Sequence, residues 1–280
     1  MHCLSVDVEE HFQVTAFESP MRRRHWDQFE SRVRHNTDRM VELLGQRGAK
    51  ATFFVLGWVA ERYPRVVHTI VKAGHELASH GYGHELITAQ TVKQFRQDVR
   101  KTKSIIEDVS GQAVAGYRAP SFSITSETVW ALSVLAEEGY RYDSSMFPVQ
   151  HDVHGLQYAN SRLHQIDTPA GCLWEVPPST VSVAGLRIPV AGGGYLRQFP
   201  FGLYSWLLKR AATQGHPLVM YLHPWEIDPG QPRMAGSWVS RFRHYRNLSQ
   251  TESRLTHILH RFRFGSIRDV LLGGIEGVGR

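Results

Sequence analysis

Two histidines four residues apart, His80 and His84 in "SHGYGH", form the clearest candidate metal-ligand pair in this sequence of 280 residues. Gly81 and Gly83 argue against a regular helix here, so we expect a tight loop at the end of a strand. Two imidazoles with one carboxylate leave a coordination position open on zinc, which is typical of a catalytic site. The alternative is a pair of hydrogen-bonded loop residues, in a chain that contains 16 histidines.

A carboxylate for such a site could come from "LSVDVEEHFQV", where an apolar run ends in Asp7, Glu9 and Glu10. Side chains alternate between the two faces of a strand, so Asp7 and Glu9 share one face. Glu10 joins them if the strand bends at its end. A catalytic base and a metal ligand must share a face to meet the same water molecule. The alternative is that all three carboxylates are solvated.

Strand-like segments alternate with helix-like segments through the first half of the chain, which favours parallel β-α units in a barrel or a doubly wound sheet. The expected strands are 3–8, 50–57, 75–80, 113–120, 140–146 and 217–226. The expected helices are 36–48, 64–74, 89–111, 125–139, 199–213 and 249–262, with short strands and a Gly-rich turn over 163–197. Active sites lie at the C-terminal ends of parallel strands. Several strand ends here carry chemistry-bearing residues: Asp7, His80, Arg118, Asp143 and His223.

The composition, 42% hydrophobic and 21% charged, is typical of a soluble globular enzyme. No run of about 18 apolar residues predicts a membrane span, and the start of the chain lacks the features of a secretory signal. We therefore expect a cytoplasmic protein with Cys3 and Cys172 reduced. The net charge of +6 is concentrated in the arginine-rich segments 21–26 and 240–264. These segments resemble solvated helix faces, so no nucleic-acid partner is expected.

Six motifs occur in order over about residues 3–226: "SVDVEEHF", "KATFFVLGWVAERYP", "AGHELASHGYGH", "YRAPSFS", "YDSSMFP" and "MYLHPWE". This ordered set resembles the polysaccharide deacetylase family, carbohydrate esterase family 4 with NodB homology. The resemblance implies an α/β fold, an irregular (β/α) barrel. We expect one catalytic domain over 1–280, with about 227–280 as a short C-terminal extension packed on the barrel. "VDVEEHFQV", "AGGGYLR" and "HPWEIDPGQPR" are similar to a subfamily found with bacterial exopolysaccharide and exosortase loci.

The resemblance also implies roles for individual residues. His80 and His84 match the metal-binding histidines, and Asp7 matches the catalytic base. Arg118 matches the arginine that orients this base and holds it ionised, and His223 matches the general acid. The family pattern has two adjacent aspartates, whereas Val8 stands in the second place here. Glu9 is then the expected metal ligand, with Glu10 as the alternative.

Weaker signals suggest substrate contacts. Trp225 could offer a stacking face to a sugar, although a buried core tryptophan fits the sequence equally well. Pro120 in "YRAPSF" is the other expected substrate contact. Asp143 is expected to anchor its loop, and His151 with Asp152 to cap a turn.

The predicted function is metal-dependent removal of N-acetyl groups from N-acetylhexosamine units of a polysaccharide, oligosaccharide or lipid-linked precursor. The expected context is exopolysaccharide or cell-envelope biosynthesis. The expected cofactor is one divalent ion, with zinc as first choice, and the expected partner is an N-acetylated glycan. Two alternatives are an amidohydrolase acting on a small non-peptide C–N bond and a non-catalytic carbohydrate-binding protein. The sequence leaves open the sugar, the metal, the oligomeric state including a homo-oligomer, and whether the substrate is a precursor or a mature polymer.

Overall fold

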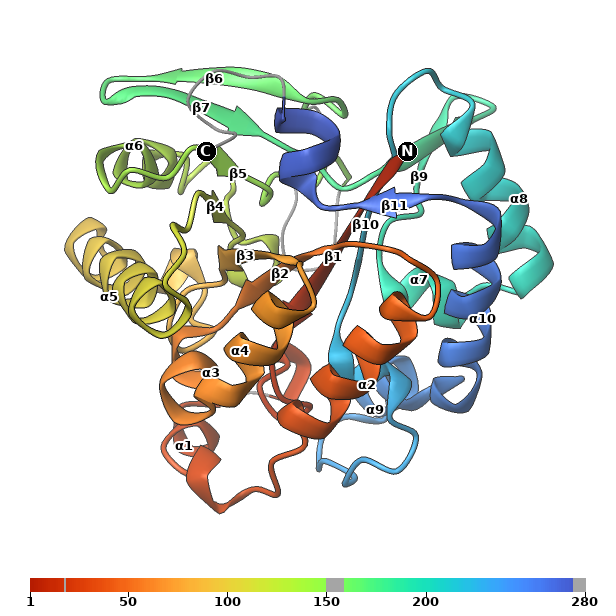
Figure 1. Ribbon diagram of the computed structural model, residues 1–280, viewed down its shortest axis with the longest axis horizontal. Coiled ribbons are helices and arrows are strands. Elements are labelled where there is room, and N and C mark those ends of the chain that lie inside the picture. The colour runs from red at the N-terminus through yellow and green to blue at the C-terminus, as the bar shows by residue number, and fades with distance from the viewer. Residues whose placement is uncertain (18, 150–158, 274–280) are drawn as a thin grey trace.

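The computed structural model describes residues 1–17, 19–149 and 159–273, and shows a largely parallel sheet surrounded by helices (Figure 1). The α/β class and the irregular barrel expected from the sequence are confirmed. Among the described helices, none has the length and apolar character that crossing a membrane requires. His151 and Asp152, expected to cap a turn, lie outside the described residues.

In the central sheet, β1 lies beside the terminal strand β10, and it pairs in parallel with β10 on one side and β2 on the other. The order along the sheet is β10 (Val219–Leu222), β1 (His2–Val8), β2 (Thr52–Val55), β3 (Glu76–Ser79), β4 (Gly116–Tyr117), β5 (Tyr142–Asp143), β7 (Gly171–Glu175) and β6 (His164–Thr168). The β6–β7 hairpin is antiparallel. β10 and β6 are the two ends of this order. Within the described strands they do not pair with each other, so the barrel is open.

Alternation along β1 separates two apolar cores. Leu4, Val6 and Val8 pack in the large core between the sheet and its helices. Cys3 packs in a smaller core in the barrel interior. Because side chains alternate, Asp7 points to the same interior side as Cys3. The apolar run at the start of the chain therefore fixes the direction of its first carboxylate.

Helices cover the outside of the sheet (Figure 1). They are α1 (Pro20–Arg23), α2 (Val33–Gly45), α3 (Gly57–Arg62), α4 (Pro64–Lys72), α5 (Val92–Ser110), α6 (Trp130–Glu137), α7 (Gly193–Gln198), α8 (Phe201–Ala212), α9 (Trp238–Tyr245) and α10 (Leu248–Arg261). The longest, α5, begins in a capping box, in which Thr91 and Gln94 satisfy each other's backbone N–H groups.

Several expected elements differ from those in the structure, most clearly in the following segments. The strands expected at 113–120 and 140–146 shorten to the two-residue β4 and β5, because few residues there pair with their neighbours. The Gly-rich segment expected to be a turn contains helix α7, preceded by the hairpin of β8 (Thr180–Val183) and β9 (Leu186–Pro189). Helix α9 overlaps the arginine-rich segment 240–264, which resembles a solvated helix face, but it begins well before the helix expected at 249–262.

The C-terminal part of the described chain returns to β1. β11 (Phe264–Gly265) pairs with His2 and Cys3, and the N–H groups of Ile267 and Arg268 donate to Thr52 and Glu76 at the base of the barrel interior. These contacts close the end of the barrel opposite to the C-terminal ends of the strands.

Candidate active site

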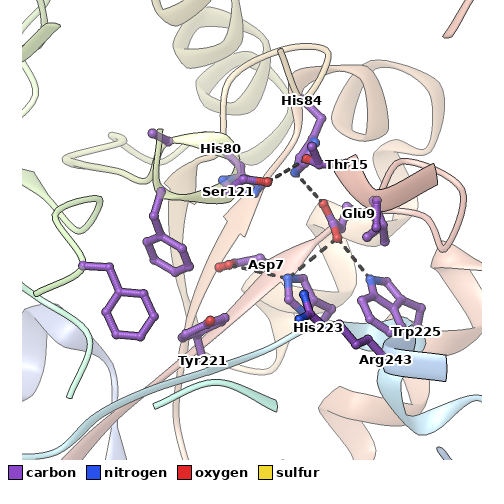
Figure 2. Close-up of a pocket in the computed structure, with 15 residues that line it drawn as sticks. Asp7, Glu9, Thr15, His80, His84, Ser121, Tyr221, His223, Trp225 and Arg243 are labelled. Carbon is purple, nitrogen blue, oxygen red and sulfur yellow. Dashed lines mark hydrogen bonds and ion pairs between the residues drawn. The ribbon is translucent and has the colours of Figure 1, made fainter. Parts of the chain in front are cut away.

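A cavity of 370 Å³ lies at the C-terminal ends of β1, β3 and β10 (Figure 2). Its lining residues are Asp7, Glu9, Val14, Thr15, Ala16, His80, His84, Ala119, Ser121, Phe122, Phe147, Tyr221, His223, Trp225 and Arg243. The strand ends thus bring the base, ligand and acid candidates together in one cavity. Arg118, the remaining predicted member, is fully buried directly beneath it.

Glu9, His80 and His84 form the candidate metal site. One ligand atom from each residue can be chosen so that all three atoms lie within 4.8 Å of one another, and all three residues are buried. His84 Nε2 lies 2.9 Å from Glu9 Oε2, yet this oxygen accepts a hydrogen bond from none of the described residues. A buried carboxylate oxygen without a donor is costly unless a cation faces it. The donor set therefore fits a divalent ion such as zinc.

The two histidines are held in place by neighbouring residues. His80 Nδ1 lies 2.8 Å from the carbonyl oxygen of Arg118, which can only accept, so Nδ1 carries the proton and Nε2 keeps its lone pair. His84 has a left-handed backbone with φ 51°, a strained conformation that often marks a functional site. The loop between them is anchored by Asp98 of α5, whose carboxylate accepts hydrogen bonds from the Tyr82 N–H at 3.0 and 3.1 Å.

Arg118 connects the base candidate to the rest of the barrel. Its guanidinium donates to Asp7 Oδ1 at 2.6 Å and to the hydroxyls of Ser5 and Ser144 at 2.8 Å each. It also lies 4.1 Å from the ring centroid of Phe54, in cation–π contact. Asp7 Oδ1 is thereby engaged, while Oδ2 faces His223 Nε2 at 3.9 Å.

His223 lies between the carboxylates of the cavity and a second ion pair behind it. The ring Nδ1 of His223 is 3.3 Å from Glu226 Oε2, and the backbone N–H of His223 donates to the same oxygen at 3.0 Å. Arg197 of α7 donates to Glu226 Oε1 at 2.9 Å. A side chain at Gly193 would overlap the Glu226 carboxylate, so glycine is required there. The glycines of "AGGGY" therefore allow α7 to pack against the acid candidate.

The charges of these groups set their protonation. Burial lowers the pKa of His80 to about 4, so its imidazole is neutral, as a metal ligand must be. Burial alone would raise the pKa of Glu9, but His84 and His223 outweigh burial and lower it. Burial also disfavours a charged His223, yet Glu9, Glu226 and Asp7 raise its pKa to about 9. At neutral pH the arrangement has an ionised ligand carboxylate beside a protonated imidazole.

The remaining predicted residues have varied surroundings. The Trp225 indole N–H donates to Glu9 Oε1 at 3.1 Å, and its ring is stacked between His223 and His244. A sugar could therefore reach only its edge. Pro120 is buried beside cavity residues without lining the cavity itself. Glu10 turns away and accepts hydrogen bonds from Ser31 and the Arg32 N–H, so Glu9 is the carboxylate that joins the histidines.

Four contributing residues were not predicted from the sequence: Asp98, Arg243 at the cavity wall, and Thr15 with Ser121, which share a hydrogen bond of 2.6 Å beside it. Glu226 was noted at a strand end but was given no role. Glu226 had a signal, since it lies three residues after His223 in "HPWE". Asp143, expected to anchor its loop, accepts hydrogen bonds from the hydroxyl and N–H of Ser145.

Two family models match adjacent parts of the chain. Residues 23–142 match the polysaccharide deacetylase family, and this segment contains His80, His84 and Arg118. Residues 144–272 match a domain of unknown function, DUF3473, and this segment contains His223. Asp7 and Glu9 precede both segments. The cavity is therefore assembled from both matched segments and from the strand that precedes them.

Relatives and a solved structure agree with the first match. The chain is 34% identical over 108 residues to a peptidoglycan deacetylase of Helicobacter pylori, covering 39% of this chain and 36% of that protein. It is 27% identical over 149 residues to a peptidoglycan-N-acetylglucosamine deacetylase of Bacillus cereus, covering 49% and 53%. The chain thus spans about a third to a half of these relatives.

The fold is similar to that of a Mycobacterium smegmatis protein described as a polysaccharide deacetylase, with a TM-score of 0.63 at 20% identity over 94% of this chain and 85% of that one. At this identity the similarity concerns the fold alone. Residues 23–142 therefore match the polysaccharide deacetylase family, and the fold of the chain is similar to that of a protein described as such a deacetylase.

Proposed function

We propose that this protein is a metal-dependent hydrolase that removes N-acetyl groups from N-acetylhexosamine units of a glycan. The observation that carries the proposal is the convergence of one buried carboxylate–histidine–histidine cluster with a second carboxylate and a protonated imidazole in a single cavity. Hydrolysis of an amide needs an activated water, a base for its proton and an acid for the departing amine. Each of these needs has a candidate residue here.

Glu9, His80 and His84 would hold the divalent ion, with zinc as first choice because of its preference for imidazole and carboxylate ligands. When bound, the ion would supply Lewis-acid activation of the water and of the acetyl carbonyl. Asp7 Oδ2 accepts the proton of the attacking water, since Oδ1 is engaged by Arg118. We assign stabilisation of the developing oxyanion also to the backbone of the left-handed turn at Ser121, which lines the cavity.

His223 acts after the attack. Its protonated Nε2 faces the same space as Asp7 Oδ2 and donates its proton to the amine nitrogen, so that acetate leaves and a free amino sugar remains. Glu226 holds the opposite ring nitrogen and keeps the imidazole charged before donation. Apolar and aromatic walls at Phe122, Phe147 and Tyr221 are suited to the acetyl methyl group and the sugar ring.

The test is release of acetate from a panel of N-acetylglucosamine oligomers, combined with metal analysis of the purified protein. We expect about one divalent ion per chain in the wild type and loss of both ion and activity in His80→Ala/His84→Ala. Asp7→Ala should keep the ion and lose activity. A matched control, His257→Ala/His260→Ala on α10, removes two histidines far from the cavity and should change neither quantity.

Two outcomes would overturn the proposal. Metal-free protein that still hydrolyses a small amide would indicate the amidohydrolase alternative. Bound metal without acetate release from any N-acetylated glycan would indicate a binding protein. A role in exopolysaccharide biosynthesis and a cytoplasmic location stay predictions from the sequence, which gene deletion with polymer analysis and cell fractionation would test.

A further inference from the structure

Helix α9, whose Arg243 lines the cavity, carries an exposed apolar patch. Trp238 is 79% exposed, Phe242 is 50% exposed and Val239 is 37% exposed. Spacings of three and four residues place these side chains next to one another on one face of the helix. On the opposite face, His244 is buried against Trp225 at a ring-centroid distance of 4.2 Å. The patch is therefore fixed in orientation and points away from the protein.

The sequence around this patch is rich in arginine and lacks acidic residues. The segment 229–251 contains four arginines and no aspartate or glutamate. Arg241, Arg243 and Arg246 of this segment are exposed, and Arg246 lies over the Phe242 ring at 4.9 Å. The three arginines Arg22–Arg24 at the end of α1 add to this charge.

The two arginine groups are joined in space. Arg22 donates to the carbonyl of Ala235, just before α9, at 2.8 Å. Figure 1 places α1 and the loop before α9 at the end of the molecule to which β1 points. Arg243 lines the catalytic cavity, and Arg23 lines a second cavity that shares Thr15 with it. Arginines of both groups thus border the two cavities, and the exposed apolar patch lies on the same helix as Arg243.

We propose that α9 and the Arg22–Arg24 segment form a docking surface for an anionic lipid bilayer. Tryptophan and phenylalanine insert at the boundary between head groups and acyl chains, while arginines pair with anionic head groups. Charge complementarity favours a negatively charged occupant, and the exposed Trp238 and Phe242 favour an occupant with an apolar layer. Docking would hold the cavity entrance at the membrane surface, where membrane-bound sugar units lie.

The binding does not depend on catalysis, so it is measured separately from acetate release. The full chain is mixed with phosphatidylcholine vesicles that contain or lack phosphatidylglycerol, and the bound fraction is measured by flotation. We expect binding to the anionic vesicles that weakens as salt is added. Arg241→Gln/Arg246→Gln should reduce it about thirtyfold. Trp238→Ser/Phe242→Ser should reduce it by more than about tenfold.

Matched controls change the same residue types elsewhere. Arg47→Gln/Arg263→Gln removes two exposed arginines near the opposite end of β1, and Leu203→Ser/Trp206→Ser removes exposed apolar residues of α8. Both should bind as the wild type does, and circular dichroism confirms that every variant is folded.

Three results would overturn the proposal. If the wild-type protein does not bind anionic vesicles, it has no such surface. Binding to heparin that survives Trp238→Ser/Phe242→Ser, with no vesicle binding, would identify a soluble polyanion as the occupant. A wild-type dimer that this double variant converts to a monomer would identify a second copy of the chain.

Discussion

Buried carboxylates occur at two levels of the barrel interior, and their pKa values are shifted in opposite directions. Near the cavity, Glu9 and Glu226 face cationic imidazole or guanidinium groups, which lower their pKa values despite burial. Deeper in the barrel, Glu76 accepts hydrogen bonds from the hydroxyls of Thr52 and Tyr142, and burial raises its pKa.

The pair Asp143 and Glu175 also belongs to the deeper level. These residues face each other on β5 and β7, and burial raises the pKa of both side chains. They are in hydrogen-bonding contact, which requires a shared proton. This difference shows that burial alone does not keep a carboxylate ionised. Glu9 and Glu226 are ionised because cationic groups lie beside them.

The largest expected effect comes from removing the cation beside Asp7. Arg118→Met leaves the buried Asp7 carboxylate without its partner, so we expect a loss of about 3–5 kcal/mol in the free energy of unfolding. Activity should fall about a thousandfold because Asp7 loses its orientation. Urea unfolding and acetate release measure the two effects.

The double variant Arg118→Met/Asp7→Asn sharpens this test. Asparagine needs no cation, so most of the lost stability should return while activity stays absent. A single Arg118→Met variant as stable as the wild type would break the comparison, since it would show that the cavity carboxylates need no cation.

A smaller effect is expected when the second ion pair is weakened. Glu226→Gln removes a negative charge that raises the pKa of His223, so this pKa should fall from about 9. His223 donates a proton only below its pKa, so the activity of the wild type is lost as the pH rises through about 9. In the variant the same loss should begin at lower pH, with activity reduced about tenfold at neutral pH.

The measurement is the pH dependence of kcat, compared with Glu252→Gln on α10 as a control far from the cavity. An unshifted alkaline limb in Glu226→Gln would mean that Glu226 does not set the charge of His223.

The smallest expected effect is an increase in the free energy of unfolding when Glu175, at the deeper level, is changed. The folded-state pKa of Glu175 lies above its unfolded value, so stability falls as the pH rises from the unfolded value of about 4.3 through the folded one. Glu175→Gln can donate to Asp143 without carrying a charge. We expect it to raise the free energy of unfolding by about 1–2 kcal/mol at neutral pH, with the gain vanishing toward pH 4.

Thermal unfolding across this pH range checks the expectation, with the exposed Glu127→Gln as a flat control. A loss of stability in Glu175→Gln at neutral pH would show that Glu175 is ionised in the folded protein, and the contrast between the two levels would fail.

Local patterns in the sequence predict much of the site. Alternation along β1 places Asp7 and Glu9 on one side, and the rule that active sites lie at strand ends brings His80 and His223 to them. The structure places these side chains in one cavity, and their positions follow from the sequence because each depends on a short segment whose apolar residues fix its own orientation.

The remaining features depend on contacts between distant segments. Glu226 contacts Arg197 and Gly193 of α7, and these contacts hold it beside His223. From the sequence alone, the glycines of this segment predict a turn and not a helix. The ring of Trp225 is covered by His244 of α9, a contact that the helical spacing of the arginine-rich segment 240–264 does not predict. Tertiary packing overrides local propensity at these positions.

The position of β1 has a consequence for how the chain folds. Besides β2, it pairs with Val219 of β10 and Phe264 of β11, more than two hundred residues later, so one edge of β1 stays unpaired in a nascent chain until β10 has been synthesised. Such long-range pairing slows folding and leaves an edge open to aggregation. Asp7 can therefore assume its place only at the end of folding, and a shortened chain lacking β10 should depend strongly on chaperones.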